Sequence, residues 1–370
     1  MGDTATLDGI LKDVFEDFVS SQVNDKNPLV DLFKPETIPF GGREIKYATK
    51  VGRNASPMFV GEDSAFATAG TPAYVQFTVT AKKAMGRIRL TAEVIDDTAK
   101  GEYAYKQALK EEMKDLIDNF AKRQEFALAT DGRGVLALID EADPDGDQTL
   151  ELDAPGGVTN DNFGNRYIQP GMVLAAINPA TGAPRAVTAE VTACNEDGSD
   201  VTVNTAGAAW ASAWANSDYI VQAAAASTSA TPSVNDTSYE KAWWGMLALI
   251  DDGTYREEYF GVQRDTYPNL KSYVRASSGA LALDTMQLVS DVVEQKLGGR
   301  IDLVLAHHST RRTYLQLLEA DRRYTGESLQ RPDGGTVAFK QQDITFAGVP
   351  FRAIKSFPLD IVMFLDKANS

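Results

Sequence analysis

Residues 97–130 carry the pattern of one long α-helix, and the other elements of the chain must be arranged around it. The segment contains no proline, and its single glycine, Gly101, lies near the start. Large apolar residues recur at steps of three and four, the spacing that places side chains on one face of a helix: Tyr105, Leu109, Met113, Leu116 and Phe120. At about 1.5 Å per residue the helix would be about 50 Å long. The glycines of residues 131–134 predict its end.

A long hairpin is predicted before this helix. Apolar and polar residues alternate in residues 43–51 and 74–81, which is typical of two strands. The apolar positions on one face are Ile45, Tyr47, Val75 and Phe77. The polar stretch at residues 41–70, rich in Gly, Ala, Ser and Thr, contains the tip of this hairpin. A connection of this length with so little to bury is usually functional or disordered.

The chain begins with a predicted amphipathic helix. Its apolar residues repeat at helical spacing between residues 7 and 19, and the helix should end before Asn27, since proline follows at position 28. Leu11, Phe15 and Phe18 lie on its apolar stripe. We expect these three side chains to pack on another subunit.

Residues 140–226 are strongly acidic. They hold thirteen acidic residues and only two arginines, in a chain whose net charge is -16. Short strand-like runs at residues 172–177, 186–192 and 201–204 are separated by turn sequences. The segment is therefore predicted to be a separate, well-solvated β-rich module, tethered at its exit by a low-complexity linker at residues 223–237.

The last third of the chain alternates helices and strands. A helix is expected to carry Trp243, Trp244, Leu247 and Ile250, which we interpret as packing residues. A second helix at residues 283–297 should stop at two glycines, and a buried strand follows at residues 301–306. Ser309 or Thr310 is expected to cap a third helix. A hairpin at residues 343–354 and a strand at residues 361–365 close the chain.

No catalytic site or cofactor is predicted. The glycine-rich phosphate-binding, nucleophile-elbow and zinc-helix patterns are absent. The only histidines, His307 and His308, lie between a strand and a helix and are interpreted as turn residues. Glu141, Asp143, Asp145, Gly146 and Asp147 resemble the first half of a calcium loop, but Leu152 stands at the twelfth position, where the closing glutamate belongs. The candidate ligands among them are Asp143, Asp145 and Asp147. These three aspartates are weak calcium candidates, and a solvated acidic turn is favoured.

The composition limits the partners. The negative net charge argues against a surface covered by nucleic-acid contacts, which require clustered lysine and arginine. No apolar run is long enough to span a membrane, and the first residues lack the pattern of a signal peptide. A single cysteine, Cys194, excludes an internal disulfide and fits a reducing compartment.

The order of these elements resembles the major capsid protein of tailed double-stranded DNA bacteriophages, the Hong Kong 97 fold. The hairpin matches that family's E-loop, and the long helix matches the spine helix of its peripheral domain. The tract TMQLVSDVVEQKLGGRIDLVLAHHSTRRTYLQLLEADRRY resembles the axial domain, and FAGVPFRAIKSFPLDIVMFLD resembles the usual C-terminal end. The acidic segment departs from the minimal family pattern.

The resemblance implies an α+β fold with six parts. They are an N-terminal arm (1–38), an E-loop hairpin (39–86), a peripheral domain with the spine helix (87–139), an acidic insertion domain (140–226), an axial domain (227–342) and C-terminal strands (343–370). It also implies a structural protein that forms pentamers and hexamers of an icosahedral virion capsid. The implied partners are further copies of the same chain and packaged double-stranded DNA, which is bound without sequence specificity. A separate scaffolding protein, a portal and a decoration protein are also implied.

Two alternatives remain open at this point. An encapsulin-like nanocompartment would keep the fold and enclose a protein cargo. A monomeric α/β hydrolase or calcium-binding surface protein would instead be a single 40 kDa species with a cleft. The inter-subunit contacts expected from the capsid interpretation are Leu11, Phe15, Phe18, Ile45, Tyr47, Val75 and Phe77.

Overall fold

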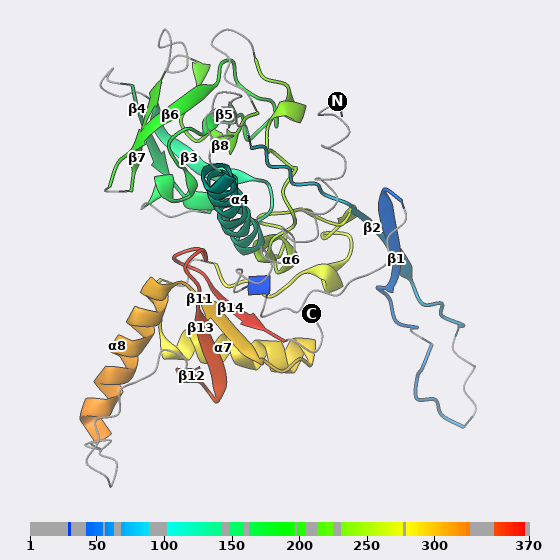
Figure 1. Ribbon diagram of the computed structural model, residues 1–370. Helices are drawn as coiled ribbons and strands as arrows, with labels where there is room; N and C mark the ends of the chain where they lie inside the picture. Colours follow the sequence, from blue (N-terminus) through cyan, green and yellow to red (C-terminus); the bar gives the residue numbers. More distant parts are fainter. Residues whose placement is uncertain are drawn as a thin grey trace.

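The computed structural model describes most of the chain as a mixture of helices and several β-sheets (Figure 1). The described residues are 29–30, 42–54, 56–62, 68–88, 102–142, 148–158, 163–196, 198–204, 213–224, 231–276, 279–325 and 344–366. The predicted N-terminal helix, with Leu11, Phe15 and Phe18, lies outside these ranges. So do Asp143, Asp145 and Asp147.

The predicted hairpin is confirmed. Strands β1 (Glu44–Lys50) and β2 (Tyr74–Thr80) pair antiparallel over their full lengths, with Tyr47 opposite Phe77. In Figure 1 the hairpin projects away from the rest of the molecule. The two strands form a sheet of their own, so only one end of the hairpin has the body of the protein to pack against.

The long helix is also confirmed, as α4 (Glu102–Ala129). Ile117, Ala121 and Phe126 are buried along it. The helix ends where predicted, and Gly132 follows with φ +73°. A Cβ atom there would lie 2.2 Å from the backbone oxygen of Trp243, so the close approach of that segment requires glycine at this position.

The acidic segment forms a closed β-barrel with the strand order β3-β4-β7-β6-β5-β8 (Figure 1). Its strands are β3 (Val135–Ala142), β4 (Thr149–Asp153), β5 (Val173–Ile177), β6 (Ala189–Cys194), β7 (Asp200–Asn204) and β8 (Tyr219–Gln222). Two 3-10 turns, η1 (Pro155–Gly157) and η2 (Gly164–Tyr167), follow β4. The predicted runs correspond to β5, β6 and β7. The sequence interpretation did not include β3, β4 and β8, and β3 begins before the predicted entry at residue 140.

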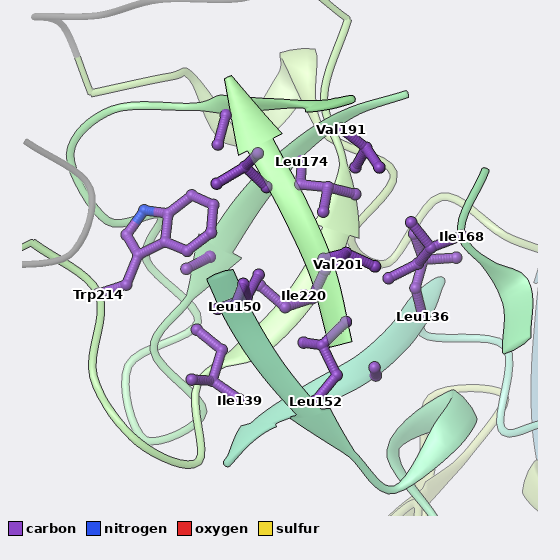
Figure 2. Packing of buried hydrophobic residues seen from close by; sticks show 14 of the residues in the cluster. Leu136, Ile139, Leu150, Leu152, Ile168, Leu174, Val191, Val201, Trp214 and Ile220 are labelled. Carbon is purple, nitrogen blue, oxygen red and sulfur yellow. The ribbon is translucent and has the colours of Figure 1, made fainter. Parts of the chain in front are cut away.

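The interior of the barrel is filled by aliphatic side chains and one tryptophan (Figure 2). Leu136, Leu150, Leu174 and Ile220 are fully buried there. The same cluster includes Phe126, which belongs to α4 and not to the barrel. The core of the barrel is therefore shared with a side chain of α4, whereas the sequence predicted a separate module between two tethers.

The C-terminal part contains a four-stranded sheet with the order β12-β13-β11-β14. Its strands are β11 (Leu303–Ala306), β12 (Thr345–Phe346), β13 (Val349–Ala353) and β14 (Val362–Leu365), and β11 is parallel to β13 and antiparallel to β14. Helices α7 (Leu283–Val292), extended by a π-helical turn (Val293–Leu297), and α8 (His308–Thr325) flank β11 in the chain. This confirms the predicted strands and both of these helices.

One helix of this region differs from the expectation. Only α6 (Met246–Leu249) forms there, so Trp243 and Trp244 precede it. Gly245 lies so close to the end of α4 that a Cβ atom would stand 1.9 Å from the backbone oxygen of Thr130. The chain therefore turns against α4 at this point, and the two tryptophans are placed before the turn.

A 3-10 turn, η3 (Val234–Asp236), ends the predicted linker, whose two ends pair at Ala223 and Thr237.

None of the helices in the described part combines the length and the apolar content that crossing a membrane requires.

Candidate subunit-contact surface

The base of the hairpin is fixed to its own chain. The ring of Phe77 packs edge-on against Tyr259, with ring centroids 5.3 Å apart. The backbone N–H of Thr78 donates to the Phe260 oxygen at 3.1 Å, and the Asn269 side chain donates to the Val51 oxygen at 2.8 Å. We call Trp244, Tyr259, Phe260 and Asn269 the hairpin anchor. Phe77 is only 8% exposed, so its expected contact with another subunit is replaced by this contact within the chain.

The hairpin anchor is held in shape by one buried arginine. Three of the four anchor residues lie in or beside two short strands, β9 (Glu258–Tyr259) and β10 (Val262–Gln263), and in the 3-10 turn η4 (Pro268–Leu270) that follows them. Arg264 follows β10, is completely buried, and donates to the backbone oxygens of Ala248 and Asp251. Its guanidinium lies over the ring of Tyr259, 5.1 Å from the centroid. Arg264 thus connects the segment after α6 to the ring that supports Phe77.

A second arginine holds the other side of the hairpin anchor. Arg256 makes two hydrogen bonds to the carboxylate of Glu240, at 2.8 and 2.9 Å, and lies over the ring of Trp244. Trp244 in turn stacks on Phe260, with ring centroids 4.3 Å apart. The Lys82 ammonium donates to the backbone oxygen of Glu240 at 2.7 Å, and burial lowers the pKa of this lysine. The chain leaving the hairpin is thereby tied to the same cluster.

Away from its base, the hairpin is exposed. Tyr74 is 64% exposed and Tyr47 43%, and Ile45 and Val75 are half-buried. Near the tip, Met58 and Val60 are each more than half exposed, and Phe59 is fully exposed. The expected contact residues did not include Met58, Phe59 and Val60, although three large apolar residues in succession within a polar stretch were a visible signal. Within the described part of the chain, these three side chains do not join a core.

The barrel is joined firmly to the C-terminal sheet and to α4. The hydroxyl of Tyr167 donates to the Ser356 oxygen at 2.9 Å, and its ring lies against Phe126, with centroids 3.8 Å apart. Burial raises the pKa of Tyr167 to about 12. Arg166 donates to the Phe357 oxygen at 3.3 Å, and Arg133 donates to the Tyr219 hydroxyl at 2.9 Å. These contacts hold the barrel against α4 and the segment that precedes β14.

The two histidines have a local structural role. His307 precedes α8, and its Nδ1 accepts a hydrogen bond from the backbone N–H of Ser309 at 3.1 Å. His307, and not Ser309 or Thr310, therefore caps this helix, because Ser309 and Thr310 already lie inside it. Burial, followed by the positive charges of Arg166 and His308, lowers the pKa of His307 to about 4. Burial, followed by Arg311 and Arg166, lowers the pKa of His308.

Acid should therefore weaken this helix cap. Because the pKa of His307 is lower in the folded chain than its ordinary value of 6.5, the stability it contributes is present above pH 6.5 and is lost as the pH falls toward 4. We expect His307→Asn, which keeps an acceptor at the cap but does not titrate, to reduce the fall in Tm between pH 7 and pH 4 by roughly 2 °C. Thermal unfolding of both chains at each pH measures this. An equal fall in both chains would contradict it.

The single cysteine and the buried tryptophan of the barrel have structural roles. Cys194 donates weakly to the Ile168 oxygen at 3.7 Å, and burial raises the pKa of its thiol, which disfavours the reactive thiolate. Trp214 is buried in the barrel core and donates to the Ala186 oxygen, as expected of a packing residue. Within the described part of the chain, no group of three or more His, Cys, Asp or Glu side chains is placed to hold a metal ion.

The similarity of this chain to known proteins is slight. No family model matches the chain, and no curated protein matches it. Among solved structures, the chain is similar to one from a cyanophage A-1(L) capsid asymmetric unit, with a TM-score of 0.45 and 12% identity. That similarity covers 92% of this chain and 70% of the other. The proposal below rests on the elements of this chain itself.

Proposed function

We propose that this chain is a major capsid protein of the Hong Kong 97 type, which assembles with copies of itself into pentamers and hexamers of an icosahedral bacteriophage head. Its parts would correspond to the N-terminal arm, E-loop, peripheral domain with spine helix, axial domain and C-terminal strands of that fold. The barrel would be an insertion between the spine helix and the axial domain. The role is structural and involves no catalysis.

The observation that carries this proposal is the hairpin. It is fixed at its base by Phe77 and Thr78, while its outer part presents Tyr74 and the Met58–Val60 segment to solvent. Exposed apolar side chains on an arm that extends from the body favour burial against another molecule. In a closed shell every copy would give one arm and receive another, so that modest contacts are multiplied. Ile45, Tyr47 and Val75 remain proposed contact residues, together with Leu11, Phe15 and Phe18.

The partners follow from the same proposal. The shell would enclose double-stranded DNA without reading its sequence, consistent with the net charge of -16. A separate scaffolding protein, a portal and a decoration protein are further proposed partners. Assembly would take place in the host cytoplasm, and the mature location would be the virion.

Purified full-length protein tests the proposal directly. Size-exclusion chromatography and negative-stain electron microscopy should reveal shells or five- and six-membered rings. A single 40.1 kDa species at all concentrations would contradict it. The content of the shells separates the two related functions: nuclease-protected DNA after expression with the packaging partners supports a capsid, and a specific enclosed protein supports a nanocompartment.

A further inference from the structure

One face of the hairpin is basic and exposed. Lys46 and Lys50, together with Glu44, lie on the face opposite to Phe77, because successive residues of a strand point to opposite sides. Across the hairpin the two lysines are paired with Thr78 and Tyr74. Residues 39–86 hold six basic and three acidic residues, in a chain with an overall charge of -16. The hairpin therefore has the opposite charge to the protein as a whole.

The barrel has the complementary charge. Glu141, Glu151 and Asp200 lie directly opposite one another on the adjacent strands β3, β4 and β7. Leu150 and Leu152 on either side of Glu151 are buried in the barrel core, so this row points outward. Carboxylates directly opposite on neighbouring strands repel one another. A basic partner on this surface would relieve the repulsion.

The hairpin does not reach the barrel of its own chain. Figure 1 shows the hairpin projecting from the molecule at a distance from the barrel. Lys46, Lys50 and Glu141 make no ion pair with any other described residue. These three exposed side chains can therefore face a second molecule.

We infer that the basic face of the hairpin binds the outer surface of the barrel on a second copy of this chain. The inference rests on the proposed function and names the surface that receives the arm. Each copy would use two different patches, the hairpin and the barrel. Such a heterologous contact generates a ring when the rotation between copies closes. The exposed Met58–Val60 segment would add apolar area beside the charged contact.

A charge-swap experiment on the full chain tests this inference. The double variant K46E/K50E reverses the hairpin, and D140K/E141K reverses one end of the acidic surface, where both side chains are exposed. Each double variant should raise the protein concentration required for assembly by roughly tenfold or more, because repulsion replaces attraction at every contact. The chain carrying all four substitutions should assemble again. R275E/R300E, which makes the same change of charge on exposed residues elsewhere, should assemble as the unaltered chain does.

The outcomes separate this inference from the proposed function. If the unaltered chain forms no shells or rings, the proposed function fails and the inference fails with it. If shells form and both double variants assemble normally, or if the fourfold variant is not restored, only the inference is overturned. If K46E/K50E assembles normally but loses nuclease-protected nucleic acid, the basic face binds nucleic acid and the inference is also overturned. Circular dichroism of each variant before assembly confirms that the subunit is folded.

Discussion

Replacing Phe126 by alanine should lower the free energy of unfolding by about 3–5 kcal/mol, the usual cost of removing a buried phenylalanine ring. Phe126 is 4% exposed, packs in the barrel core and lies against the ring of Tyr167. Because the residue belongs to α4, the cavity would weaken the barrel and its attachment to the helix together. Urea unfolding followed by circular dichroism measures the change.

Lys122→Ala is the matched control for Phe126→Ala. It lies one turn earlier on α4 and is exposed, so its substitution should change the stability by less than about 0.5 kcal/mol. If Phe126→Ala had as small an effect as this control, the barrel would not depend on the helix. That result would support the prediction of a separate module.

Replacing Arg264 by methionine should cost about 3 kcal/mol or more and loosen the base of the hairpin. The guanidinium is the positive charge beside the buried Asp251, whose carboxylate accepts hydrogen bonds from the backbone N–H groups of Tyr255 and Arg256. Replacing the guanidinium would remove a buried positive charge near this carboxylate, and loss of a compensating charge in a buried site is strongly destabilising. The backbone oxygens of Ala248 and Asp251 would also lose their donors.

The second readout for Arg264→Met is proteolysis of the hairpin. Tyr259, over which the guanidinium lies, supports Phe77, so trypsin should cleave at Lys50 or Arg53 faster in the variant than in the unaltered chain. Gln263→Met is the control, because Gln263 is the last residue of β10, directly precedes Arg264 and has an exposed side chain. Unchanged cleavage in Arg264→Met, with only the stability reduced, would show that Arg264 does not position the hairpin.

These two substitutions act on two separate requirements of a shell subunit. Phe126 keeps the acidic barrel in a fixed position relative to α4, and Arg264 keeps the hairpin anchor in shape. If the hairpin of one copy binds the barrel of the next, both positions must be fixed for rings of identical contacts to close. Arg264→Met should therefore impair assembly under conditions in which the subunit is still folded.

The sequence alone determined the elements whose pattern is local. A period of two predicted β1 and β2 with their antiparallel pairing, and a period of 3.6 predicted α4 with its glycine-marked end. The continuous apolar run of β11 and the turn between β12 and β13 were equally clear. In each case the residues that define the element are neighbours in the chain.

The tertiary structure decided what covers each face. Tyr47 and Phe77 are directly opposite one another on the same face of the hairpin, yet Tyr47 is exposed and Phe77 is buried under Tyr259. In the barrel, β3 pairs with β8, which is distant in sequence, and both strands were missed. Periodicity fixes the side toward which a residue points, but the surface that meets that side is contributed by remote segments. The closure of the barrel around Phe126 is a result of that long-range packing.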